Sequence, residues 1–178
     1  MTCAVGPVPS GRLPGTGWFV AACVAGLLHA AASLYWALGG TWLADTVGQW
    51  ALDWRTPDPV GAGASLLAIA AVKAAAAVVP LVNHLRRIPF ACLVRQVSWV
   101  GSVLLIAYGG LNTVAAWLML AGTIRPDAPP DPVALSGHAA LWDPLFLVWG
   151  LALFVGLWRT RALTAARSAS ALVVGRGA

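Results

Sequence analysis

Four long runs of apolar residues, separated by more polar connections, dominate the chain. They cover about residues 18–38, 60–82, 97–121 and 138–158. A helix of about 21 residues rises roughly 31 Å and can cross the hydrocarbon core of a bilayer. Because backbone polar groups must be paired inside a membrane, each run is expected to be a helix. The predicted fold class is an all-α integral membrane protein, an antiparallel four-helix transmembrane bundle.

The ends of the chain differ from the apolar runs. Residues 1–17 are rich in Gly and Pro and are predicted to be a disordered N-terminal tail, and residues 161–178 form a basic tail. Residues 18–160 are then a single four-span membrane domain. A cleaved signal peptide is the alternative for the first run, since small residues lie at 30–33, but the run continues past them to a Tyr35-Trp36 pair.

The connection after the first run has two interpretations. Leu43, Val47, Trp50 and Trp54 recur at helical spacing, which is typical of a short amphipathic helix lying in the membrane interface. A Trp-rich loop anchored at the interface explains the same residues equally well. Both interpretations stay open at this stage.

Composition supports a membrane location and charge gives an orientation. Hydrophobic residues make up 60% of the chain, mean hydropathy is +0.80, and there are 10 Trp. The net charge of +5 does not indicate a nucleic-acid partner, because the Arg residues lie at the ends of apolar runs and form no patch. Seven of the 10 Arg fall in the second connection and the C-terminal tail, and five of the six Asp fall in the other two connections. The positive-inside rule therefore predicts that both termini are cytoplasmic.

Several polar and aromatic side chains fall inside the predicted spans. We expect them to form one interior cluster in the outward-facing half of the bundle, because a polar group facing lipid is costly. Depth counting places two near the midplane, two slightly to either side of it, and four in the outer half. These candidate ligand-binding residues are His29, Lys73, Tyr108, Asn112, Tyr35, Trp36, Trp142 and Asp143.

The two charged members of this set are expected to pair. A charged side chain at the centre of a span costs about 2.5–3.5 kcal/mol on insertion scales, so Lys73 and Asp143 would each reduce the cost of the other. Such a pair could fix helix register, or it could serve a proton or ion relay or bind a substrate charge. For His29, a hydrogen-bonded core imidazole is favoured over a metal or haem ligand, and His138 is expected to be solvated near the start of the last helix.

Motifs of soluble-style catalysis do not occur in the sequence. Cys3, Cys23 and Cys92 are scattered without a CxxC pair, and there is no HExxH, GxSxG or phosphate-binding Gly loop. We therefore predict no catalytic residues, no metal and no cofactor.

Two motifs carry a family resemblance. HAAASLYWALGGTW at residues 29–42 and HAALWDPLFLVWG at residues 138–150 resemble domain-of-unknown-function family 3995, a group of small bacterial membrane proteins. The resemblance implies a four-span fold in the bacterial cytoplasmic (inner) membrane, and no established activity.

Three functions fit these observations. The favoured one is a small-molecule or lipid-binding module, or an accessory subunit, with a polar outward-facing pocket. The alternatives are an ion- or proton-coupled small transporter that acts as a homodimer, and a structural or assembly protein. The lipid bilayer is the expected partner in each case, together with a homo-oligomer or a larger membrane complex.

Overall fold

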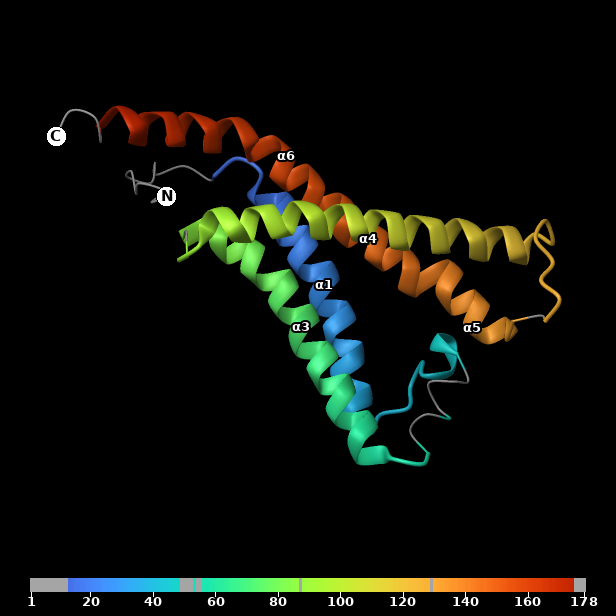
Figure 1. The fold of residues 1–178 in the computed structure, drawn as a ribbon. Coiled ribbons are helices and arrows are strands. Elements are labelled where there is room, and N and C mark those ends of the chain that lie inside the picture. Colours follow the sequence, from blue (N-terminus) through green and yellow to red (C-terminus); the bar gives the residue numbers. More distant parts are fainter. Residues whose placement is uncertain (1–12, 49–52, 54–55, 87, 129, 175–178) are drawn as a thin grey trace.

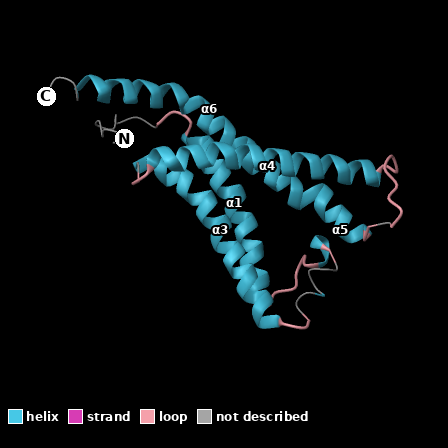
Figure 2. Cartoon of the chain, viewed as in Figure 1, coloured by secondary structure: helices cyan, strands magenta, loops and turns pink. Residues whose placement is uncertain are grey.

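A computed structural model describes residues 13–174 apart from 49–52, 54–55, 87 and 129, and this part of the chain contains helices and loops but no strand (Figure 2). Three of the long helices are α1 (Thr16–Ala37), α3 (Pro59–Arg86) and α4 (Ala91–Leu120). The last rod is built from α5 (Pro132–Gly137), the π-helical turn η2 (His138–Trp142) and α6 (Asp143–Val174). Helix α6 continues through residues 161–174, so that part of the expected basic tail is helical.

The prediction of four membrane-spanning helices is confirmed. The four segments that are long and apolar enough to cross a bilayer are Thr16–Ala37, Pro59–Arg86, Ala91–Leu120 and Pro132–Arg161. Each overlaps one of the predicted runs, and the protein is therefore an all-helical multi-pass membrane protein. The largest differences are at the starts of the third and last spans, which begin at Ala91 and Pro132 and not near residues 97 and 138.

The helices pack as two pairs joined through the middle of the molecule. The pair α1–α3 and the pair α4–α6 have the most extensive contacts, and α1 also packs along α6. Helices α3 and α4 make few contacts and diverge from the turn between them, which gives the molecule a wedge shape (Figure 1). The packing order is therefore α3, α1, α6, α4, with little contact between the first and the last.

The closed end of this wedge has an apolar, tightly packed core. Its core cluster contains Phe19, Ala22, Ala25, Ala77, Trp149, Ala152, Leu153 and Leu157. A Cβ placed on Gly26 would lie 2.6 Å from the Cβ of Ala77 and 2.7 Å from the indole of Trp149. Small residues at such contacts let helices approach closely in lipid, where apolar side chains alone give little driving force for association.

The open end of the wedge carries the first connection. Residues 41–48 form turns and a short 3-10 helix, η1 (Asp45–Val47), rather than the start of an amphipathic α-helix. Trp50 and Trp54, on which half of that pattern rested, lie outside the described residues. Helix η1 packs against α5 and η2, so the loop bridges from the α1–α3 pair to the α4–α6 pair.

Candidate functional site

The last membrane helix starts at an ordinary helix cap. Asp131 accepts a hydrogen bond from the backbone N–H of Val133 at 2.9 Å, and Pro132 occupies the first turn. Both features favour a helix start at this point. His138 therefore lies inside the helix and not near its start as expected, and its side chain is 34% exposed.

A π-helical turn then sets the direction of His138. In a regular α-helix, side chains five residues apart point about 140° away from each other. The wider turn at His138–Trp142 brings His138 and Asp143 to the same side of the helix. Pro144 follows at once, and because proline has no N–H and its ring clashes with the preceding turn, a local widening of the helix accommodates it.

Asp143 is paired with His138 and not with Lys73. His138 Nδ1 lies 3.0 Å from Asp143 Oδ2, and Asp143 is only 2% exposed. His138 Nε2 lies 3.2 Å from the carbonyl oxygen of Val47. A carbonyl can only accept, so Nε2 carries a proton, and a second proton is shared between Nδ1 and the carboxyl group. The predicted Lys73–Asp143 pair is wrong because both partners are engaged elsewhere.

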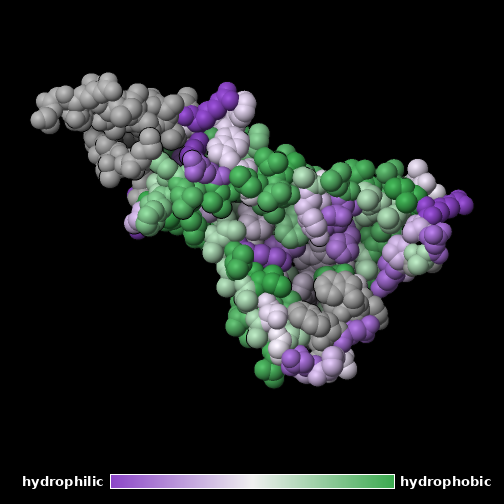
Figure 3. All heavy atoms as spheres, viewed as in Figure 1, coloured by the Kyte–Doolittle hydropathy of each residue, from purple (hydrophilic) through white to green (hydrophobic). Residues whose placement is uncertain are grey.

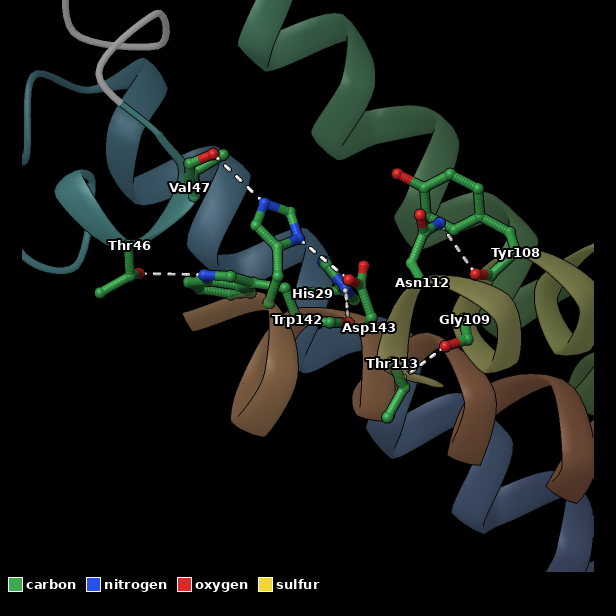
Figure 4. A network of polar contacts seen from close by, with 10 residues as sticks. His29, Thr46, Val47, Tyr108, Gly109, Asn112, Thr113, Trp142 and Asp143 are labelled. Carbon is green, nitrogen blue, oxygen red and sulfur yellow. Dashed lines mark hydrogen bonds and ion pairs between the residues drawn. The ribbon is translucent and has the colours of Figure 1, made fainter. Parts of the chain in front are cut away.

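Trp142 holds the first connection from the other side of the same turn. Its indole Nε1 donates to Thr46 Oγ1 at 3.0 Å (Figure 4). The ring of Trp36 packs edge-on against the Trp142 ring, with the ring centroids 5.2 Å apart. A side chain at Gly137 would collide with the backbone of Thr46. We call the residues that join this loop to η2 the loop clamp. They are Thr46, Val47, His138, Trp142 and Asp143.

A second polar group lies deeper in the spans, between α1 and α3. Lys73 Nζ donates to Ser33 Oγ at 3.0 Å and lies 3.4 Å from His29 Nδ1. His29 Nε2 donates to the backbone oxygen of Trp142 at 3.2 Å. Since Nε2 carries the proton, Nδ1 offers its lone pair to the ammonium group of Lys73. His29 is thus a buried, hydrogen-bonded imidazole, as the favoured interpretation predicts, and it links this group to the loop clamp.

Phe146 stands at the centre of this deeper group. Its ring stacks on His29 with centroids 3.8 Å apart and meets Tyr108 edge-on at 5.5 Å. Lys73 Nζ lies 5.6 Å from the same ring centroid. Residues from α1, α3 and α4 therefore lie around one aromatic ring of α6. We call His29, Ser33, Lys73, Tyr108 and Phe146 the midplane cluster.

The sequence analysis missed Phe146 because an apolar residue in an apolar helix carries no signal of its own. The one sequence feature that points to Phe146 is its place in the DPxF motif, three residues after Asp143. Three residues is close to one helical turn, so the two side chains follow one another along the same stretch of α6. The motif therefore spans both the loop clamp and the midplane cluster.

The remaining predicted residues lie at the edge of the site. Tyr108 is 55% exposed, and Asn112 donates to its backbone oxygen at 2.9 Å, so the two share a face of α4 (Figure 4). Within the described part of the chain, the Tyr108 hydroxyl has no hydrogen-bond partner. Trp36 belongs to the loop region, where its Nε1 donates to the backbone oxygen of Trp42 at 3.0 Å. Tyr35 is not brought into either group, because its ring packs beside Gly40 and is 45% exposed.

The surface between the two helix pairs is recessed, and hydrophilic residues gather there and at the ends of this face, while apolar side chains cover most of the area between them (Figure 3). Polar side chains inside a span normally face the protein interior or a water-filled cavity. The fold and this site together define a multi-pass membrane protein with a polar cluster at its centre.

The chain belongs to a family described as protein of unknown function (DUF3995), whose sequence pattern matches residues 26–153. The matched range contains every residue of the midplane cluster and of the loop clamp. No curated protein and no solved structure matches the chain.

Proposed function

We propose that this protein binds a small molecule or a lipid in the wedge between α3 and α4. The observation that carries the proposal is the midplane cluster, in which α1, α3 and α4 each place a side chain beside Phe146 of α6 while α3 and α4 make few contacts with each other. Ionisable and polar groups inside a membrane are costly and mark functional sites by default. Phe146 and Tyr108 offer an aromatic wall, and the hydroxyl of Tyr108 offers a donor.

The distribution of charge supports an outward-facing site in the bacterial cytoplasmic membrane. With the Arg-rich second connection and C-terminal segment in the cytoplasm, the wedge narrows toward the cytoplasm and opens toward the outside. The loop clamp then lies across the outer end of the site, where it can control entry. In this arrangement the protein is a binding module or an accessory subunit of a larger membrane complex.

Native mass spectrometry with an absorption spectrum tests the proposal on protein extracted gently from its own membrane. We expect a stoichiometric bound mass on the wild type that is lost in Phe146→Ala. Phe154→Ala is the matched control, because Phe154 packs on Trp99 and Trp158, away from the cluster. Bare wild-type protein, or a mass retained in Phe146→Ala, contradicts the proposal and favours a structural or assembly role.

A second candidate function is a proton-coupled transporter acting as a homodimer. The observation that favours it is a connected series of ionisable groups, in which His138 and Asp143 share a proton and His29 joins the neighbouring Trp142 backbone to Lys73. Proteoliposomes with an imposed pH gradient test this function. Acidification faster than in empty liposomes, abolished in a folded Asp143→Asn variant, supports it, and a rate equal to that of empty liposomes excludes it.

A further inference from the structure

We infer that the ligand of the midplane cluster is an amphiphilic anion, with a carboxylate or phosphate group on Lys73 and an apolar part on Phe146 and Tyr108. This inference rests on the proposed function, since it names the chemical class that the same site would take.

The charge of Lys73 is not balanced by the protein. The sequence has no Glu and six Asp, and all six Asp lie in the described part of the chain. Within that part, the single ion pair is the one between His138 and Asp143. The other five Asp belong to the two connections at the outer end. A cation at the centre of a span is costly, so a ligand that brings a negative charge is favoured there.

The hydrogen bonds of Lys73 orient its ammonium group without neutralising it. An ammonium group has three donors. One is directed to Ser33 Oγ and one to His29 Nδ1, and both acceptors are neutral. His29 is held in the required tautomer by the Trp142 backbone oxygen. One donor is left for a ligand, and an anionic acceptor makes the stronger, charge-assisted hydrogen bond.

The surroundings of Lys73 require that the anion also has an apolar part. Lys73 Nζ lies 5.6 Å from the centroid of the Phe146 ring, and the centroid of the Tyr108 ring lies 5.5 Å from the same centroid. Lys73 is half-buried near the middle of the 28 residues of α3, so the bound group lies at bilayer depth. A fully hydrated inorganic ion would lose its water without gaining matching contacts on these aromatic faces. An organic anion gains both the ion pair and the apolar contact.

The same chemistry has two sources, a membrane lipid that enters sideways between α3 and α4 and a soluble organic anion that enters from the open end. Three probes tell them apart, namely dodecyl phosphate, which partitions into the bilayer, butyl phosphate, which stays in water, and neutral dodecanol. Binding is measured by native mass spectrometry and titration on full-length protein in nanodiscs of zwitterionic lipid. The variants are Lys73→Gln, which keeps donors but removes the charge, Lys73→Arg, which keeps the charge, and Arg159→Gln as a control.

We expect saturable binding of dodecyl phosphate to the wild type and to Lys73→Arg, weakened about 10- to 100-fold in Lys73→Gln. Arg159→Gln also removes one positive charge, but Arg159 lies over Trp18 at the closed end, and binding should not change. Butyl phosphate binding as tightly as dodecyl phosphate identifies a soluble anion, and a requirement for the long chain identifies a lipid.

Two results overturn the inference in distinguishable ways. Dodecanol binding as tightly as dodecyl phosphate, with no loss in Lys73→Gln but a loss in Phe146→Ala, excludes the anion and leaves the binding site intact. No bound probe and no copurifying mass on the wild type excludes both the anion and the site.

Discussion

The two halves of the wedge are built from the same helices by different physical means. In the closed half, Phe19, Trp149 and Leu157 interdigitate with small residues, and the core contacts are mainly apolar. In the open half, the helices are joined by the hydrogen bond from His29 to the backbone of Trp142 and by the edge-on contact between the rings of Tyr108 and Phe146. In lipid, apolar surface alone gives little association energy, so close packing stabilises the first half and polar contacts stabilise the second.

A single face of α1 shows the change from one half to the other. Phe19, Ala22 and Gly26 lie in the packed core, and His29 and Ser33 continue the same buried stripe into the polar cluster. The face is buried throughout, so burial by itself does not distinguish the halves. The difference is that the closed half fills its space with its own side chains, while the open half keeps a charged amine beside an aromatic ring. This contrast distinguishes a structural region from the proposed binding region.

Overpacking the closed half should have the largest effect on stability. In Gly26→Leu the new side chain would collide with Ala77 and Trp149, and we expect the free energy of unfolding to fall by about 1–3 kcal/mol or more. Steric trapping in bicelles measures this value. Gly101→Leu is the matched control, because a Cβ at Gly101 has no atom within 4 Å and its effect should stay within about 0.5 kcal/mol. Equal effects of the two substitutions would contradict the tight packing.

Breaking the loop clamp should have an intermediate effect. Asp143→Ala leaves His138 Nδ1 without its partner in a largely buried site, and a loss of about 1–3 kcal/mol is expected. Hydrogen exchange of residues 41–48 should rise at the same time, since His138 also donates to Val47. Asp127→Ala, in an exposed connection, serves as the control and should change neither quantity. Unchanged exchange at 41–48 in Asp143→Ala would show that the pair does not hold the loop.

A smaller effect is expected from the hydrogen bond on the far side of the clamp. Thr46→Val removes the acceptor of the Trp142 indole N–H, which should cost about 0.5–1.5 kcal/mol. Trp142→Phe removes the donor, and the double variant should lose less than the sum of the two single variants, because they break the same bond. Strict additivity in this double-mutant cycle would mean that the bond contributes nothing.

The smallest effect on stability should come from the residue with the largest effect on binding. Lys73→Met removes a cation that the protein does not balance, and His29 and Ser33 each keep one hydrogen bond, to Trp142 O and His29 O. We expect the free energy of unfolding to stay within about 1 kcal/mol of the wild type or to rise. Thermal and steric-trap unfolding check this. A fall in the free energy of unfolding of more than about 3 kcal/mol would show that Lys73 has a structural role.

Much of the fold follows from the sequence, because hydropathy and length are enough to place four membrane helices. The interpretation of His29 as a hydrogen-bonded core imidazole also agrees with its buried position on α1. The wedge could not be predicted, because it depends on which small residues meet, such as Gly109 against the backbone of Leu147.

The partners of the charged residues were harder to predict. Counting depth along a regular helix from residue 138 placed Asp143 within reach of Lys73, but the helix begins at Pro132 and contains a π turn. Asp131 before Pro132 is a recognisable helix start, and Pro144 is a recognisable source of irregularity. Together, the earlier helix start and the irregularity at Pro144 would have predicted that Asp143 faces His138.

Cysteine accessibility tests the central contrast most directly. In a background with Cys3, Cys23 and Cys92 changed to Ser, single cysteines replace Asn112 beside the recess, Ala77 in the packed core and Val72 on the lipid-facing side of α3. A membrane-impermeant maleimide should label the Asn112→Cys variant fastest, and dodecyl phosphate should slow that reaction, while the other two positions stay unlabelled. Labelling of Asn112→Cys no faster than of Ala77→Cys would contradict an open, polar half and with it the binding site.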